Sequence, residues 1–346
     1  MGPTPSEFIT TGPCSFLSDD HTPAELIWVV DGDGRMSIRY SMEPLSPHSG
    51  VPSSSNVWRP TLDAFYNFPR IAGVDLSWSD ICRETLTYDS DPDSETRESA
   101  SQFFLGGDFG SKGVLGKVYF LPHYRAKVMN VSEESLVQDC MTALGVGSPC
   151  DRLFAFTESL PKDKRPSIAM VAVDCLEPSK NRAKVYFRTH VSTFNDIKDL
   201  LTLGGSLSGP IIIDTLAILH RLWELFFPGV AADESLVPTF PERFQPGFMI
   251  YFEMILGQQT LHPKVYIPVR QYCKSDAQIG SAISKYYEGI NDDFSQRYIS
   301  DLANLFPHRP LAARTGIHTY VGCCSRKTGP QLSFYLSPEC FAPERT

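Results

Sequence analysis

The stretch "GKVYF" at residues 116–120 returns as "AKVYF" at residues 183–187 and as "PKVYI" at residues 263–267. Side chains along a β-strand point alternately to its two faces, so the lysine and tyrosine of each triplet share one face and the valine lies on the other. If helices cover the valines, the lysines and tyrosines face the inside of the molecule. An interior lined in this way is a binding chamber, and its positive charge predicts an anionic guest.

Each triplet stands in a longer unit that reads as a β-hairpin, with an apolar run, a polar turn and a second strand. Five hairpins are predicted, at residues 24–40, 102–120, 167–187, 248–267 and 318–338. Segments with helical periodicity separate them, at residues 59–85, 132–145 (with Ser132 as N-cap), 192–205, 211–227 and 275–306. This repetition predicts an α+β fold, in which about ten antiparallel strands close around a central lumen with helices outside. We expect a single domain over residues 1–346, with residues 1–21 loosely ordered.

The composition argues against several classes of function. The formal net charge of −9 argues against nucleic acid or an anionic membrane as a partner. The most apolar window, residues 210–229, is interrupted by charged residues, so it predicts an amphipathic helix rather than a membrane span. The N-terminus lacks the basic and apolar regions of a secretory signal. Nine scattered cysteines without a CxxC pair favour reduced, buried thiols in the cytoplasm over a zinc site or a disulfide framework.

Six pieces of the chain occur in the order typical of one family. They are "TPAELIWVV", "IRYSMEPLSPHSG", "GKVYFLPHYRAK", "RAKVYFR", "PKVYIPVRQYCKSD" and "HTYVG" followed by "LSFYLSP". On these pieces the sequence resembles the fungal aromatic prenyltransferases of the dimethylallyltryptophan synthase type, which have the ABBA barrel fold. The resemblance implies transfer of a dimethylallyl or longer prenyl group from its diphosphate to an indole or another electron-rich aromatic, in fungal secondary metabolism. Donor and acceptor are then the small-molecule partners of a monomer or homodimer.

The resemblance also implies roles for individual residues. Five cations would bind the leaving diphosphate, on which negative charge builds as its bond breaks: Arg39, Lys117, Arg182, Lys184 and Lys264. Four tyrosines would shield the allylic cation through cation–π attraction: Tyr119, Tyr186, Tyr266 and Tyr320. Glu25 would act as the catalytic carboxylate that accepts the indole N–H. A turn centred near residue 32 predicts that Glu25 lies almost opposite Arg39 across the first hairpin.

Plainer interpretations stay open. The cations could be surface charges, each tyrosine alone could serve packing, and Glu25 with Arg39 could form only a cross-strand salt bridge. No aspartate-rich DDxxD motif is present, so we expect metal-independent catalysis without a cofactor, although Mg²⁺ or Ca²⁺ could stimulate it.

The chain departs from the family pattern in three places. The Glu25 motif lies several dozen residues earlier than in relatives, Gly110 stands near the position of a family lysine, and Cys324 replaces a last shield tyrosine. The small residues Gly110 and Cys324 predict a wider pocket. Because the family lysine is absent, we also expect proton removal to depend on another group. These departures leave open an alternative function, in which an enzyme on the same barrel cyclises, isomerises or hydrolyses a prenylated product. A third interpretation is a non-catalytic carrier of an apolar ligand, since small β-barrels enclose such ligands.

Overall fold

The computed structural model describes residues 15, 17–18, 20–43, 67, 74–88, 101–110, 113–241 and 247–345. The strands in this part of the chain form a closed antiparallel barrel in the order β1-β10-β9-β8-β7-β6-β5-β4-β3-β2. Their bounds are β1 Ala24–Asp31, β2 Met36–Met42, β3 Phe103–Gly110, β4 Gly113–Phe120, β5 Ser167–Asp174, β6 Ala183–Thr189, β7 Phe248–Met254, β8 His262–Ile267, β9 His318–Arg326 and β10 Gly329–Leu336. All five predicted hairpins are confirmed.

Helices follow the hairpins, as predicted. Their bounds are α3 Ser77–Leu86, α4 His123–Met129, α5 Glu133–Ala143, α6 Gly147–Ser159, α7 Phe194–Thr202, α8 Pro210–Phe226, α9 Val269–Tyr272, α10 Asp276–Tyr287 and α11 Asp292–Leu305. Ser132 caps α5 by accepting the backbone N–H of Ser135 at 3.1 Å, which confirms that prediction. Most of the predicted helical segment before α3 lies outside the described residues. Within the described part, no helix combines the length and apolarity needed to cross a membrane.

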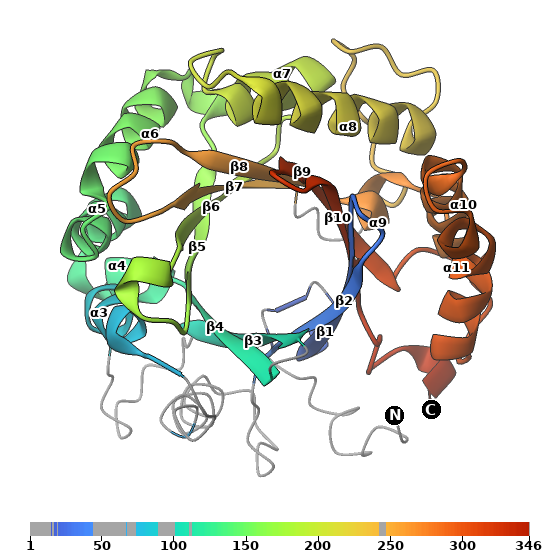
Figure 1. The fold of residues 1–346 in the computed structure, drawn as a ribbon, viewed down its shortest axis with the longest axis horizontal. Helices are drawn as coiled ribbons and strands as arrows, with labels where there is room; N and C mark the ends of the chain where they lie inside the picture. The colour runs from blue at the N-terminus through green and yellow to red at the C-terminus, as the bar shows by residue number, and fades with distance from the viewer. Residues whose placement is uncertain are drawn as a thin grey trace. The chain divides into compact units, whose positions relative to one another are not determined.

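The chain divides into two compact units. The first comprises Met1–Glu25, Ile38–Phe187 and Tyr251–His262. In it β4 pairs with β3 and β5, and helices α3 and α5 lie against β4 and β5 (Figure 1). The ring of Phe187, two residues after Val185, meets Phe154 of α6 at 5.9 Å. The valine face of the triplets therefore packs against helices, and Val118 and Val185 are fully buried.

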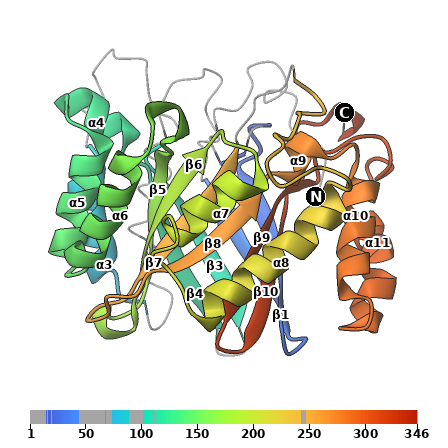
Figure 2. The same cartoon turned by 90° about the horizontal axis from the view of Figure 1, so that it is seen from above.

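The second unit comprises Leu26–Ser37, Arg188–Ile250 and Pro263–Thr346. Here β10 pairs with β1 and β9, and α8 lies against β9. Figure 2 shows α10 and α11 side by side. Trp28 of β1 packs against Phe294 and Tyr298 of α11, with ring centroids 5.4 and 5.5 Å apart. These aromatic contacts fix which face of β1 is turned to the helices.

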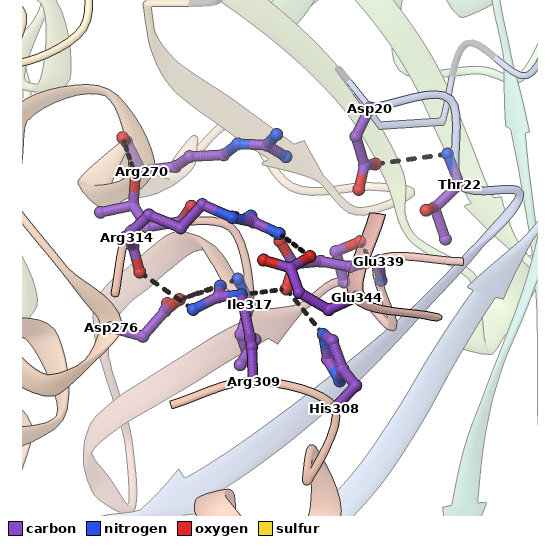
Figure 3. Close-up of polar contacts among 12 residues, drawn as sticks. Asp20, Thr22, Arg270, Asp276, His308, Arg309, Arg314, Ile317, Glu339 and Glu344 are labelled. Carbon is purple, nitrogen blue, oxygen red and sulfur yellow. Dashed lines mark hydrogen bonds and ion pairs between the residues drawn. The ribbon is translucent and has the colours of Figure 1, made fainter. Parts of the chain in front are cut away.

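A buried ionic network ties the end of the chain to the start of α10 (Figure 3). The guanidinium of Arg309 donates to Asp276 Oδ2 at 2.5 Å and to Glu339 Oε2 at 2.8 Å. Asp276 also accepts the backbone N–H groups of Ile317 and His318. Because these charges are paired and hydrogen-bonded, they can stay ionised inside the protein.

Candidate active site

Asp108, on β3, holds two of the predicted cations in the first unit. Arg39 is its register partner on β2, and Arg39 Nε lies 3.1 Å from Asp108 Oδ2. Lys117 Nζ, on β4, donates to both carboxylate oxygens at 2.7 Å. Burial, and then the charge of Arg39, lower the pKa of Lys117 to about 7, while Asp108 and Asp174 oppose the shift. The sequence pattern marks Asp108 only as the end of an apolar run, so nothing in it points to this contact.

Asp174, at the end of β5, holds two more cations and is fully buried. Arg182 Nε donates to Oδ2 at 2.7 Å, and Lys184 Nζ donates to Oδ1 at 3.0 Å. Lys117 is the register partner of Asp174 on β4. Burial alone would raise the pKa of Asp174, but Lys184, Arg182 and Lys117 hold it well below its ordinary range. The carboxylate is therefore ionised at neutral pH.

The structure thus brings together four of the five predicted diphosphate ligands within one compact unit: Arg39, Lys117, Arg182 and Lys184. Lys117 and Lys184 are only 8% and 6% exposed, so they are not surface charges. A further carboxylate, Glu253 of β7, lies 3.4 Å from Arg182 Nη1. We call these cations with their three carboxylates, Asp108, Asp174 and Glu253, the cation cluster.

Tyrosine rings lie along the same strand faces as the cation cluster. Tyr119 follows Lys117 by two residues and Tyr186 follows Lys184 by two, so each ring shares a face with its lysine. The centroids of Tyr119 and Tyr186 are 6.2 Å apart, and Tyr186 meets Tyr251 of β7 at 5.0 Å. Tyr251 was not predicted, because the run "FMIYFEM" is apolar almost throughout and does not reveal which residues face inward.

Lys264, the fifth predicted cation, lies in the second unit and is described with it. Its side chain is 2% exposed, and its Nζ donates to Ser333 Oγ at 2.7 Å and lies 5.4 Å from the ring centroid of Tyr266. Gly322, the register partner of Tyr266, makes room for this lysine. A Cβ on Gly322 would lie 2.8 Å from Lys264 Cε. The lysine is therefore held between a hydroxyl, an aromatic face and a position without a side chain.

Three tyrosines meet beside this lysine. The ring of Tyr266 lies 6.4 Å from that of Tyr320 and 5.4 Å from that of Tyr335. Tyr335 was missed, although the alternation in "LSFYL" places it on the same strand face as Ser333, which binds Lys264. The two tyrosines predicted in this unit, Tyr266 and Tyr320, therefore lie in a group of three rings with Tyr335.

A β-bulge sets the direction of Tyr320. Val321 pairs with Phe334, but His318 pairs with Leu336, so β9 has one residue more than β10 over this stretch. A bulge re-aims the side chains on one side of it relative to the other. Here the Tyr320 hydroxyl reaches the carbonyl oxygen of Gly247 at 3.4 Å, and Arg188 Nη1 at 3.5 Å. Sequence patterns carry no signal for an inserted residue of this kind.

Glu25 is buried, with 8% of its surface exposed. Backbone hydrogen bonds fix the register of the first hairpin, from Asp31 to Arg35 and from Glu43 to Pro23. They place Glu25 opposite Ser41, so Arg39, which was predicted to lie almost opposite Glu25, is displaced from that position by two residues along β2. The reason is that the turn is centred on Asp33 rather than on residue 32. Glu25 and Arg39 remain diagonal neighbours on one face.

The two small residues predicted to widen the pocket lie in different settings. Gly110 is the last residue of β3 and is exposed, and among the described residues a Cβ there would meet only the Gly113 carbonyl oxygen, at 3.5 Å. Cys324 is 1% exposed and is the register partner of Gln331 on β10. It shares the face of Gly322 and thus of Lys264. Among the described residues, no group of three or more His, Cys, Asp or Glu side chains is arranged to hold a metal ion.

Comparison with known proteins identifies the family. The model of the family described as "Tryptophan dimethylallyltransferase" matches residues 1–301. The chain is 29% identical over 337 residues to 4-O-dimethylallyl-L-tyrosine synthase of Claviceps purpurea, covering 94% of this chain and 76% of that protein. It is 26% identical over 362 residues to 7-dimethylallyltryptophan synthase of Aspergillus fumigatus, covering 97% of this chain and 76% of that protein.

Solved structures share the fold. AnaPT from Neosartorya fischeri superposes with a TM-score of 0.77 at 19% identity, covering 95% of this chain and 81% of that chain. NotF, solved in complex with brevianamide F and DMSPP, gives a TM-score of 0.77 at 20% identity, covering 94% and 82%. At such identities the likeness shows the fold alone. Since the family model matches most of the chain, this protein belongs to the tryptophan dimethylallyltransferase family and is a prenyltransferase with the ABBA barrel fold.

Proposed function

We propose that this prenyltransferase transfers a dimethylallyl or longer prenyl group from its diphosphate to an indole or another electron-rich aromatic, in fungal secondary metabolism. The observation that carries the proposal is the cation cluster, in which Arg39 on β2, Lys117 on β4, and Arg182 and Lys184 at the start of β6 are held by carboxylates of the strands between them. Relatives named as dimethylallyl-tyrosine and dimethylallyl-tryptophan synthases support the same class of reaction.

The cation cluster suits a leaving diphosphate. When the bond between the allylic carbon and the diphosphate oxygen breaks, its electron pair goes to the oxygen, and negative charge grows there. Fixed cations in a buried site stabilise that charge without having to reorganise. Arginine adds a planar fork of donors that matches phosphate oxygens, and the lysines add compact charge.

The tyrosines suit the allylic cation that is left behind. An aromatic face stabilises a desolvated cation by about 2 kcal/mol, and closely packed rings also exclude water. Tyr119 and Tyr186 stand two residues from the cations that would hold the diphosphate, so their rings would lie next to the carbon that becomes positive. The acceptor's π electrons then form the new bond, and the proton at the attacked position leaves to a base. Glu25, a buried carboxylate, would accept the indole N–H and raise the electron density of the ring.

We further propose that catalysis does not require a metal ion, because the cations supply the positive charge that Mg²⁺ supplies in other prenyl-transferring enzymes. Incubation with labelled dimethylallyl diphosphate and a panel of indoles, tyrosine and other phenols, in the presence of EDTA, tests both statements. Prenylated product with release of diphosphate is expected. Donor binding without turnover on any acceptor would contradict the transferase proposal, and turnover that EDTA abolishes would contradict metal independence.

A pair of lysine variants tests the site itself. Lys184→Ala removes a buried cation of the cluster, and we expect donor kcat/KM to fall by about 100-fold, the effect of one charged hydrogen bond of roughly 3 kcal/mol. Lys180→Ala is the matched control, because Lys180 lies on the same hairpin but is 71% exposed and pairs only with Glu177 among the contacts described. Undiminished turnover by the Lys184 variant would remove the basis for the diphosphate assignment.

A further inference from the structure

Asp174 is a negative charge placed where a negatively charged ligand is proposed to bind. A carboxylate repels a diphosphate, so its presence in the cation cluster works against donor binding in the simplest electrostatic picture. It is also fully buried, which costs free energy unless the charge is well paired. The repulsion of the diphosphate and the cost of burying the carboxylate must both be offset by a favourable effect of Asp174 on its neighbours.

The surroundings of Asp174 hold it in one position. Its backbone N–H donates to Asn181 Oδ1 at 3.0 Å, and the same oxygen accepts the backbone N–H of Arg182 at 2.8 Å. The amide of Asn181 in turn donates to the Leu176 carbonyl at 2.8 Å. The buried Asn181 side chain thus fixes the turn between β5 and β6. It binds the backbone of both Asp174 and Arg182, which form an ion pair with each other.

The benefit lies with the lysines. Desolvation lowers the pKa of Lys184, and Asp174 is the largest influence that raises it again. Desolvation also lowers the pKa of Lys117 to about 7, with Asp108 and Asp174 opposing. Without the carboxylate, both lysines would lose protons at lower pH, and a neutral amine offers little to a diphosphate. The other charged or titratable groups around Asp174 are Arg39, Asp108, Tyr119, Cys175, Arg182, Tyr251 and Glu253.

We propose that Asp174 is a positioning residue for the donor diphosphate, which keeps Lys117 and Lys184 protonated and holds Lys184 and Arg182 in place before the donor arrives. The inference rests on the proposed function, since it assumes that these cations bind the diphosphate. This positioning role differs from a purely structural one because it predicts a specific pH dependence: without Asp174, donor affinity should fall at a lower pH. A carboxylate that serves only to stabilise the fold would not set that dependence.

The test measures binding of inorganic diphosphate by calorimetry between pH 6 and pH 9, for the wild type, Asp174→Asn and Asp174→Glu. In Asp174→Asn we expect affinity to fall at a pH lower than in the wild type, by about one unit, so that the loss at pH 8 exceeds the loss at pH 6 by about tenfold. Ionisation of diphosphate itself is common to all variants and cancels in the comparison. Glu177→Gln is the matched control, because it removes one negative charge from the same hairpin at a residue that pairs with exposed Lys180.

Each outcome separates the inference from the function on which it rests. If the wild type does not bind diphosphate, the proposed function fails and the inference with it. If the wild type binds, but Asp174→Asn shows the same affinity or the same pH dependence, the inference alone is overturned. Should Asp174→Asn fail to fold, Asp174→Glu decides: its displaced carboxylate should weaken binding and shift the pH dependence part of the way, and wild-type binding at every pH would overturn the inference.

Discussion

Gly322→Ala adds a single methyl group and tests whether the buried Lys264 side chain needs the space that Gly322 leaves free. The new Cβ would lie 2.8 Å from Lys264 Cε and 3.3 Å from Nζ, well inside contact distance. Because Lys264 is buried, we expect its side chain to give up its hydrogen bond to Ser333 when it moves away from the new methyl group. A charged hydrogen bond contributes about 1.5–3 kcal/mol, and replacing a strand glycine by alanine returns about 0.5–1 kcal/mol. We therefore expect the free energy of unfolding to drop by about 1–2 kcal/mol.

The matched control is Gly110→Ala. Gly110 is also a strand glycine, but within the described part of the chain a Cβ there would meet only the Gly113 carbonyl oxygen, at 3.5 Å. We expect this variant to be as stable as the wild type or slightly more stable, since alanine restricts the unfolded chain. Urea unfolding followed by tryptophan fluorescence gives the two free energies, and the wild-type slope should be kept in both variants.

Donor kinetics give a second measurement for the same variant. If Lys264 also contacts the diphosphate, its displacement should raise the donor KM by about tenfold, equivalent to about 1.4 kcal/mol, while the Gly110 variant keeps its KM. Equal stabilities of the two alanine variants would show that Lys264 moves without cost, and would refute the account of Gly322 as space reserved for the lysine.

Three further predictions concern pH, the ionic network and the thiols. Because the pKa of Lys117 is lowered to about 7, donor kcat/KM should fall as the pH rises through 7. The free energy of unfolding should instead increase as the pH rises from 7 towards the ordinary pKa of lysine, since the unfolded chain then binds more protons than the folded one. A pH profile of the rate measures the first effect, and urea unfolding at several pH values measures the second. Arg309→Met leaves Asp276 buried without its guanidinium partner, and should cost about 3–5 kcal/mol in urea unfolding; a change below 1 kcal/mol would contradict the network's role. Cys82 and Cys140 are buried with their sulfurs 3.6 Å apart, and burial raises the pKa of Cys82, so both should resist iodoacetamide until the protein unfolds, as mass spectrometry can show.

Much of the fold could be predicted from the sequence, because it depends on local pattern. Each hairpin is indicated by a short, continuous stretch of sequence, and the triplets at Lys117, Lys184 and Lys264 show which residues share a strand face. The register of the first hairpin could not be predicted in the same way. Two glycines flank Asp33, so the turn can be centred at more than one place, and the choice depends on pairing along the whole strand.

The candidate site was harder to predict where it depends on partners far apart in the sequence. The cations were visible because they recur in step with tyrosines, whereas Asp108 and Asp174 read as ordinary turn residues until they are seen to hold those cations. Tyr251 is hidden in an apolar run, and the bulge before Val321 adds a residue that no periodicity reveals. Charge pairing and strand irregularities are properties of the assembled sheet.

The pairing of β1 with β10 also bears on how the chain reaches this structure. Asp31 accepts a hydrogen bond from Gln331, 300 residues later, in the pair of strands that closes the barrel. Bringing such distant residues together costs roughly 5 kcal/mol of chain entropy, and during synthesis β10 emerges long after β1. Until it does, β1 and β9 each expose an unpaired edge that can join another chain. Yield in a cell should therefore depend on chaperones that protect the nascent chain, and truncation before Gly329 should give aggregates instead of a smaller folded protein.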